Sequence, residues 1–199
     1  MNINILFTGG VTPELAAQFH TVCTEVARAK VTQLSVHIAS RGGDVTSGLA
    51  MYNALKLLPC KIRTVNLGQC GSIAATLYMA GEVRQTMPAS SFFLHAACYI
   101  EGPMKGHVSP TTALILAPFR DTLCWDRERL DGYFTSPDEK YLTPAEAAAI
   151  GIVTDLSEPA PWARSDLSVV LNPHGSEVPG LELFIARLHA RAKPVKARA

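Results

Sequence analysis

Residues 62–75 read IRTVNLGQCGSIAA, and this stretch decides the class of fold. Its first part, 62–67, is apolar and β-branched and predicts a strand. A tight glycine-containing turn is expected at 68–71, and the apolar residues 72–80 predict a short helix that Gly81 caps. A strand that leads through a glycine turn into a helix is typical of α/β proteins.

The preceding segments repeat this order of strand, glycine turn and helix. Residues 3–7 predict a first strand, and Thr12-Pro13-Glu14 begins a helix with a hydroxyl cap and a proline in its first turn. Apolar and small or polar residues alternate over 34–39, which predicts the second strand. The turn 40–43 then leads into a helix over 45–58.

The following segments are less regular. Residues 92–94 predict a short buried strand, and 112–133 predict a helical region that Pro118 kinks. A capping box begins a helix over 143–150, and 152–153 resemble a last edge strand. Because crossovers between parallel strands are right-handed, we expect stacked βαβ units that form a mainly parallel sheet with helices packed outside.

Composition excludes several classes of protein. The 199 residues are 48% hydrophobic and carry a net charge of +1, so nucleic-acid and membrane partners are not expected. The five cysteines are odd in number and none are spaced as CxxC, which disfavours a disulfide framework or a zinc site. No apolar run approaches the ~20 residues of a membrane span. With no signal-peptide pattern at the start, we expect a cytoplasmic protein.

Two regions are expected along the chain. Residues 1–156 hold all the predicted strands and form one domain. Residues 157–199 are Pro-rich and basic toward the end, and we expect an extension that is partly disordered or carries one short helix near 181–188.

Ser72 is the first candidate for chemistry. It stands where a glycine turn meets a helix, so its hydroxyl would be exposed beside unpaired backbone N–H groups that can stabilise an oxyanion. The alternative interpretation is that Ser72 merely caps the helix. Cys70, two residues earlier, is either a reactive thiol or a buried filler, and its setting favours the filler.

Two further features favour the catalytic interpretation. The loop 40–48 also joins a strand to a helix through a glycine pair, so its N–H groups can point into the same crevice at the carboxyl ends of the strands. His95 follows the apolar strand 92–94 and can act as a general base. His37 is the alternative base, and a purely structural role for either histidine stays open.

Together these segments resemble the proteolytic subunit of Clp protease. The family's Ser-Pro-Gly-Gly loop corresponds to residues 40–48, its Gly-Gln-Ala-Ala-Ser-Met motif to 68–73, and its histidine to His95. Its final signature, an acidic residue before a Leu-Thr helix start and a Gly-Leu-Val strand, corresponds to 139–147 and 151–153. The resemblance extends over about residues 3–156 and implies the ClpP/crotonase fold with a projecting helical handle between His95 and Glu139.

The resemblance also implies roles for individual residues. Ser72 would be the nucleophile and His95 its base, while the N–H groups of Gly43 and Ile73 would form the oxyanion hole. Glu139 stands where the family has aspartate and would orient the imidazole. Asp138 is the alternative acid. No metal or cofactor is implied.

The implied function is that of a serine endopeptidase, as in the ATP-dependent Clp protease proteolytic subunit. It would cleave peptides or unfolded proteins through an acyl-enzyme, as a homo-oligomer for which a ring is possible. An unfoldase ATPase partner is left open, because the family's pore-lining segment has no counterpart before residue 3. Arg41 stands where the family's glycine loop has proline, a departure that concerns the substrate strand and the contacts between rings. The alternatives are a non-catalytic paralogue that serves as a scaffold and an acyl-CoA enzyme of the crotonase type.

Overall fold

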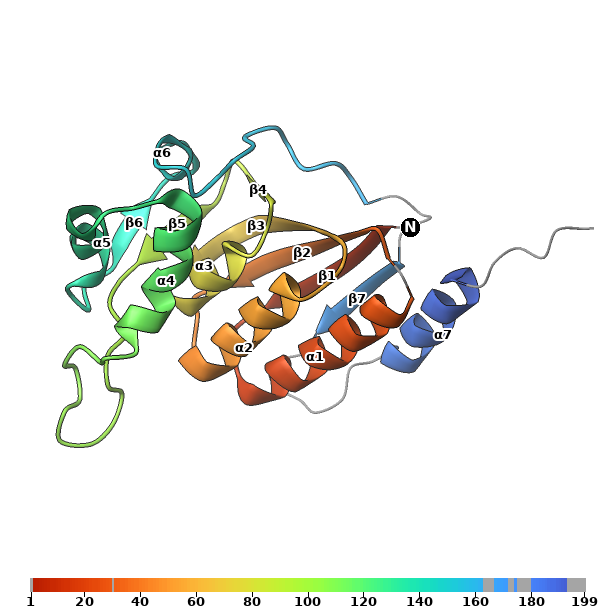
Figure 1. The fold of residues 1–199 in the computed structure, drawn as a ribbon, viewed down its shortest axis with the longest axis horizontal. Helices are drawn as coiled ribbons and strands as arrows, with labels where there is room; N and C mark the ends of the chain where they lie inside the picture. The colour runs from red at the N-terminus through yellow and green to blue at the C-terminus, as the bar shows by residue number, and fades with distance from the viewer. Residues whose placement is uncertain (1, 30, 163–166, 172–173, 175–179, 193–199) are drawn as a thin grey trace, which may run out of the picture.

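The computed structural model describes residues 2–29, 31–162, 167–171, 174 and 180–192 (Figure 1). Within these ranges seven strands join one sheet in the order β6-β5-β3-β2-β1-β7, with β4 beside β3. Every pairing is parallel except that of β5 with β6. The strands are β1 (Asn2–Thr8), β2 (Gln33–Ser40), β3 (Lys61–Gly71), β4 (Val83–Thr86), β5 (Ser91–Leu94), β6 (Lys140–Leu142) and β7 (Leu167–Leu171). The predicted mainly parallel α/β fold is therefore confirmed.

The helices lie mainly on one face of this sheet. Figure 1 shows α1, α2 and α3 side by side across that face and α7 next to α1, while α4 and α5 lie at the β5 end. The segment between β5 and α4 extends away from the sheet, but it consists of turns and irregular structure and not of the helix expected in a projecting handle. The helices are α1 (Pro13–Arg28), α2 (Val45–Lys56), α3 (Ile73–Tyr78), α4 (Thr112–Leu123), α5 (Arg127–Phe134), α6 (Pro144–Ala149) and α7 (Leu181–Ala192).

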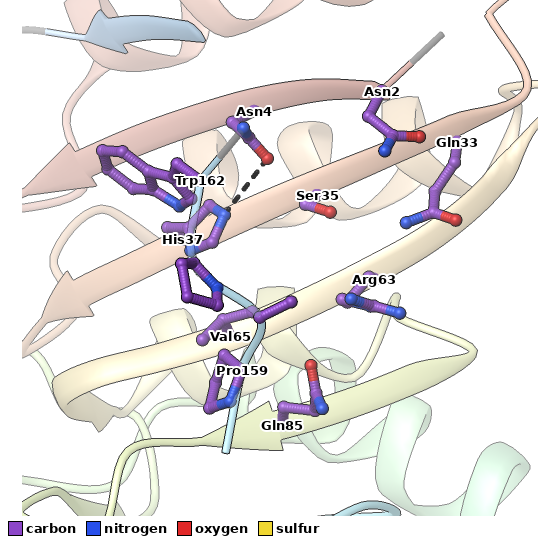
Figure 2. A pocket seen from close by; sticks show the side chains of 12 residues that line it. Asn2, Asn4, Gln33, Ser35, His37, Arg63, Val65, Gln85, Pro159 and Trp162 are labelled. Carbon is purple, nitrogen blue, oxygen red and sulfur yellow. Dashed lines mark hydrogen bonds between the residues drawn. The ribbon is translucent and has the colours of Figure 1, made fainter. Parts of the chain in front are cut away.

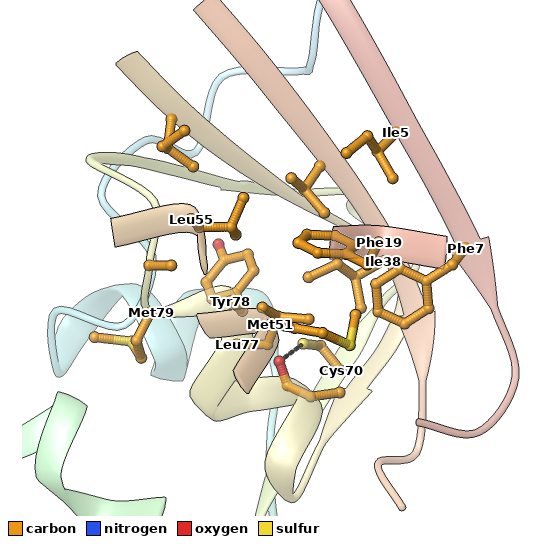
Figure 3. Packing of buried hydrophobic residues seen from close by; sticks show 14 of the residues in the cluster. Ile5, Phe7, Phe19, Ile38, Met51, Leu55, Cys70, Leu77, Tyr78 and Met79 are labelled. Atoms are coloured by element: carbon orange, nitrogen blue, oxygen red, sulfur yellow. Dashed lines mark hydrogen bonds between the residues drawn. The ribbon is translucent and has the colours of Figure 1, made fainter. Parts of the chain in front are cut away.

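The main core lies between the sheet and these helices (Figure 3). Phe19 of α1, Met51 of α2 and Tyr78 of α3 are each fully buried against the strands. The Tyr78 hydroxyl donates to the carbonyl of Gln85 at 2.9 Å, so this polar group is paired inside the core. The layer thereby fixes the position of α3, whose first residue follows Ser72.

Sheet topology brings the candidate site residues to one edge. The loops after β1, β2, β3 and β5 all leave the carboxyl ends of parallel strands. Ser72 follows β3 and His95 follows β5, and the two strands are hydrogen-bonded neighbours. This edge is where α/β sheets usually hold their ligands.

Several elements differ from the sequence-based expectations. The predicted turn 68–71 is instead part of β3, because residues 69–71 pair with 91–93 of β5. No edge strand forms at 152–153, since both N–H groups bond to the carbonyl of Ala147 and the side chains are buried. The helical region 112–133 is divided at Cys124, whose φ is 54°, while α4 continues through Pro118.

The extension after residue 156 contributes to the sheet. The sequence analysis expected one helix there, near 181–188, and α7 corresponds to it. It did not anticipate β7, which pairs with β1 in parallel and alternates buried with exposed residues. Residues of β7 and α7 are part of the same hydrophobic core, namely Leu167, Val169, Leu171, Phe184 and Leu188.

Gly48 of α2 allows α3 to pack closely, which leads to a stability prediction. A Cβ on Gly48 would lie 2.2 Å from Cγ1 of Ile73. We expect Gly48→Ala to lower the free energy of unfolding by about 1–3 kcal/mol, as overpacking does. Urea unfolding would measure this loss.

The control is Gly132→Ala in α5, where a Cβ meets no atom within 4 Å. That variant should be neutral or slightly stabilising, and equal losses in both would contradict the argument.

Candidate active site

Ser72 has a strained backbone at the junction of β3 and α3. Its φ of 53° and ψ of −130° are rare for a residue with a side chain. Its N–H donates to the carbonyl of Phe93 at 3.0 Å, which ties the junction to β5. The hydroxyl makes no capping hydrogen bond to α3, so the structure does not support the interpretation of Ser72 as a simple helix cap.

The glycine loop after β2 lies directly against this junction. A Cβ on Gly42 would lie 2.8 Å from Cβ of Ser72 and 3.3 Å from the backbone nitrogen of Ile73. The next residue, Gly43, could not carry a side chain, because its Cβ would lie 2.3 Å from the carbonyl oxygen of Val11. Hydrogen bonds from Val11 N to Gly42 O and from Asp44 N to Val11 O hold the loop in place.

Two backbone N–H groups remain available beside Ser72. Among the described residues, no hydrogen bond uses the N–H of Gly43 or of Ile73. Ile73 is the first residue of α3, where a helix leaves its N–H groups unpaired. These are the two residues for which an oxyanion hole was predicted.

His95 lies on the neighbouring strand end. Gly71 pairs with Phe93, so His95 emerges from β5 beside the point where Ser72 leaves β3. The imidazole is half-buried, and its Nδ1 is buried without a hydrogen-bond partner. Within the described ranges, no hydrogen bond joins the Ser72 hydroxyl to this ring. The structure thus brings the predicted nucleophile and the predicted base to one edge of the sheet but does not show them bonded.

The predicted acid, Glu139, comes from the antiparallel partner of β5. Leu94 pairs with Lys140, so Glu139 falls opposite His95 in the register. Its carboxylate accepts a hydrogen bond from Arg41 Nη2 at 2.8 Å and another from the Tyr141 hydroxyl. No bond to His95 is present, although the carboxylate acts electrostatically on the ring.

Asp138, the alternative acid, has a different environment. Its carboxylate accepts a hydrogen bond from the Ser136 hydroxyl at 2.7 Å, and its N–H donates to the same hydroxyl. These bonds close a short exposed loop. Asp138 therefore has no interaction with His95, whereas Glu139 acts on the His95 ring electrostatically.

Arg41 is the site residue whose role the sequence analysis missed. Its guanidinium lies 4.9 Å from the centre of the Phe93 ring, and Nη1 donates to Gln69 Oε1 at 3.3 Å while Nη2 binds Glu139. It thus connects the glycine loop with β3, with β5 and with Glu139, which directly precedes β6. In the sequence, the only sign of this role was that arginine replaces the family's proline at position 41. That Arg41 lies next to Glu139 and Tyr141 follows only from the pairing of β5 with β6.

The local charges and burial explain the ionisation of the site. Burial lowers the pKa of His95 below its usual 6.5, and the positive charge of Arg41 lowers it further. The Glu139 carboxylate and a hydrogen bond with the Pro137 carbonyl raise the same pKa but do not outweigh burial. The hydrogen bond from Tyr141 is the main cause that lowers the pKa of Glu139, and Arg41 contributes too. At neutral pH the site thus combines a neutral imidazole with an ionised carboxylate.

The remaining candidates lie elsewhere. His37 is buried on the sheet face opposite the helices, where burial and Arg63 lower its pKa to about 4. Cys70 is fully buried and donates to the carbonyl of Ala74, and burial raises its pKa, which fits a filler. Among the described residues, no three His, Cys, Asp or Glu side chains gather as metal ligands would. Helices in these ranges are too short or too polar to cross a bilayer.

Comparisons with known proteins identify the family. A family model described as Clp protease matches residues 2–111, which include Ser72 and His95 but not Glu139. Among solved structures, a point mutant of ClpP1 from Listeria monocytogenes matches with a TM-score of 0.70 and 20% identity, over 78% of this chain and 91% of that chain. At this identity the structural match supports the fold alone. Because the family model spans more than half of the sequence, the chain belongs to the Clp protease family.

Proposed function

We propose that this protein is a serine endopeptidase that cleaves peptide bonds through an acyl-enzyme. The observation that carries the proposal is the strained Ser72, whose hydroxyl makes no capping bond and whose backbone junction lies against Gly42 of the glycine loop. Among the described residues, the N–H groups of Gly43 and Ile73 make no hydrogen bond, which leaves them available to an oxyanion. His95 at the adjacent strand end supplies a neutral base. Membership of the Clp protease family supports the same general activity.

The proposed reaction uses each of these groups once in each half. Ser72 Oγ attacks the substrate carbonyl carbon while His95 Nε2 takes its proton. The N–H groups of Gly43 and Ile73 stabilise the oxyanion that forms. His95 then returns the proton to the leaving amine as the C–N bond breaks. A water molecule, deprotonated by His95, hydrolyses the acyl-enzyme and restores Ser72.

Glu139 would orient the imidazole and stabilise its charged form. Each carboxylate oxygen has a second lone pair, so Glu139 can accept from His95 Nδ1 while Arg41 and Tyr141 remain bound. Nδ1 makes no hydrogen bond in the structure, and the ring, which also interacts with the Pro137 carbonyl, would turn this nitrogen to Glu139. The bond requires a movement of the exposed 136–139 loop, and catalytic hydrogen bonds often tighten only with substrate present.

We also propose that the protein acts as a homo-oligomer on peptides or unfolded proteins. Between His95 and Glu139, the apolar side chains of Ile100, Met104 and Leu114 are 76%, 51% and 53% exposed. This apolar surface lies on the predicted handle and suits contact with a second copy. Native mass spectrometry would measure the assembly, and a stable monomer would contradict this part of the proposal.

One observation favours a second candidate, a non-catalytic scaffold. Arg41 binds the carboxylate that would orient His95, and Nδ1 of His95 lacks a partner. A chain without catalysis could keep this arrangement. The crotonase-type alternative gains no comparable support, since the family match lies with Clp protease.

A fluorophosphonate probe tests the proposed function. The wild-type protein should become covalently labelled, because such probes phosphonylate activated serines, and peptide mapping by mass spectrometry should locate the adduct at Ser72. As a control, the same protein unfolded in urea before the probe is added should not be labelled. An adduct on another serine, or an unlabelled protein that also fails to hydrolyse denatured casein, would favour the scaffold.

The proposed base predicts the pH dependence of hydrolysis. Because only neutral imidazole accepts a proton, kcat/KM should fall as pH drops through the pKa of His95, which lies below 6.5. Arg41 lowers this pKa, so Arg41→Met should move the acid limb to higher pH. Measuring kcat/KM for both proteins from about pH 4.5 to 8 in steps of about half a pH unit would show both effects. An unchanged or downward-shifted limb in the variant would contradict this assignment.

A further inference from the structure

A polar cavity that does not include Ser72 lies on the face of the sheet that the helices leave uncovered (Figure 2). Its floor is formed by β1, β2, β3 and β4, and residues 159–162 cross over it. Its volume is about 250 Å³. That is below the ~300–1,000 Å³ of pockets for drug-sized ligands, so an occupant would have only a few carbon atoms.

The cavity is lined by buried polar side chains rather than by a core. Asn4, Ser35, His37 and Gln85 are each at most 6% exposed, and Arg63 stands between them. Figure 2 shows these side chains rising from neighbouring strands toward residues 159–162. Buried polar groups normally have hydrogen-bond partners, so the unpaired atoms of His37, Arg63 and Gln85 require an explanation.

Three atoms of this cavity are buried and unpaired: His37 Nδ1, Arg63 Nε and Gln85 Oε1. His37 Nε2 lies 3.4 Å from Asn4 Oδ1, which can only accept, so Nε2 carries the proton and Nδ1 is an acceptor. The Gln85 amide nitrogen donates to Asp155 and Ser157, so Oε1 is a second acceptor. Arg63 Nε is a charged donor.

The charge of Arg63 is only partly balanced. Asp155 interacts with it electrostatically, but the Asp155 carboxylate already accepts hydrogen bonds from Gln85 and from the N–H of Ser157. A ligand that completes the cavity must therefore supply one anionic acceptor for Arg63. It must also supply donors for His37 and Gln85.

We propose that this cavity binds a small hydroxylated anion. A carboxylate or phosphate group would face Arg63, and hydroxyl groups would donate to His37 Nδ1 and Gln85 Oε1. The occupant would lie under the segment 159–162, whose Trp162 ring meets His37 edge-on at 5.1 Å. Binding does not depend on the peptidase proposal, because no residue of the cavity belongs to that site.

Isothermal titration of the full chain with D-glycerate and with glycerol 3-phosphate tests the proposal. At least one should bind saturably, whereas glycerol, which lacks the anion, and propionate, which lacks the hydroxyls, should bind at least about 10-fold more weakly. Binding of glycerate alone would identify a carboxylate site, and binding of glycerol 3-phosphate alone a phosphate site. The Trp162 fluorescence should change with binding, and Trp162→Phe should lose this signal while it keeps most of the heat.

Variants distinguish the cavity from other surfaces. Arg63→Met should weaken binding at least about 10-fold, because a charge-assisted hydrogen bond is lost. Arg63→Lys keeps the charge but lacks the Nε donor, and it provides a second test if the methionine variant does not fold. The control is Arg127→Met on the exposed surface of α5, which should bind normally.

The proposal is overturned if neither anion binds at about 50 mM, well above a millimolar Kd, or if propionate binds equally. Full affinity in the folded Arg63 variants would overturn it too.

Discussion

Replacing Ser72 with alanine is expected to lower the rate of peptide hydrolysis by at least about 10³-fold, because the attacking oxygen is lost. The activity that remains would come from substrate binding and from the N–H groups of Gly43 and Ile73, which the change leaves in place. Turnover of a fluorogenic peptide by matched preparations would measure the loss. The same variant should retain its affinity for a non-cleaved peptide.

The effect should be catalytic rather than structural. The Ser72 side chain makes no capping hydrogen bond, so its removal costs the fold little, and the melting temperature should stay close to that of the wild type. The control is Ser168→Ala on β7, at the opposite end of the sheet, which removes only a long hydrogen bond of 3.4 Å from Asn4 Nδ2. It should hydrolyse peptides normally. Equal activity of Ser72→Ala and wild type would exclude Ser72 as the nucleophile.

Local chemistry in the sequence was sufficient to predict much of this fold. The alternation over 34–39, the glycine turns and the capping box at Thr143 each depend on neighbours within a few residues. The capping box is present as predicted, with reciprocal bonds between Thr143 and Glu146. The pairing of β5 with β3 was not predictable in this way. It converts the expected turn 68–71 into strand, because its hydrogen bonds come from residues about twenty positions later.

In the candidate site too, the residues marked by local sequence were predicted, and those that depend on distant pairing were not. Ser72, His95 and the two amide donors are marked by local strand-to-helix turns, and the structure places them at one edge of the sheet. The partners of Glu139 are not marked locally. Arg41 reaches it across 98 positions of sequence, and this contact exists only because β2, β3, β5 and β6 lie in one sheet. A charged residue in a glycine loop indicates a partner but does not identify it.

The choice between Glu139 and Asp138 yields the second large effect. Glu139→Gln should reduce kcat/KM by about 10³–10⁴-fold if its carboxylate orients and stabilises the imidazolium, since loss of the triad acid has this effect elsewhere. Glu139 also raises the pKa of His95, so the acid limb of the remaining activity should move to lower pH. A role confined to loop structure would lower the rate without this shift.

Asp138→Asn is the matched control for that experiment. Asp138 bonds only within its own exposed loop, through the Ser136 hydroxyl, so the variant should lose less than about 3-fold in rate, as surface changes usually do. The opposite order of effects would transfer the acid role to Asp138 and require the 136–139 loop to rearrange around His95. If neither variant changes the rate, His95 acts without a carboxylate partner. The bonds from Arg41 and Tyr141 would then give Glu139 a purely structural role in joining β6 to the glycine loop.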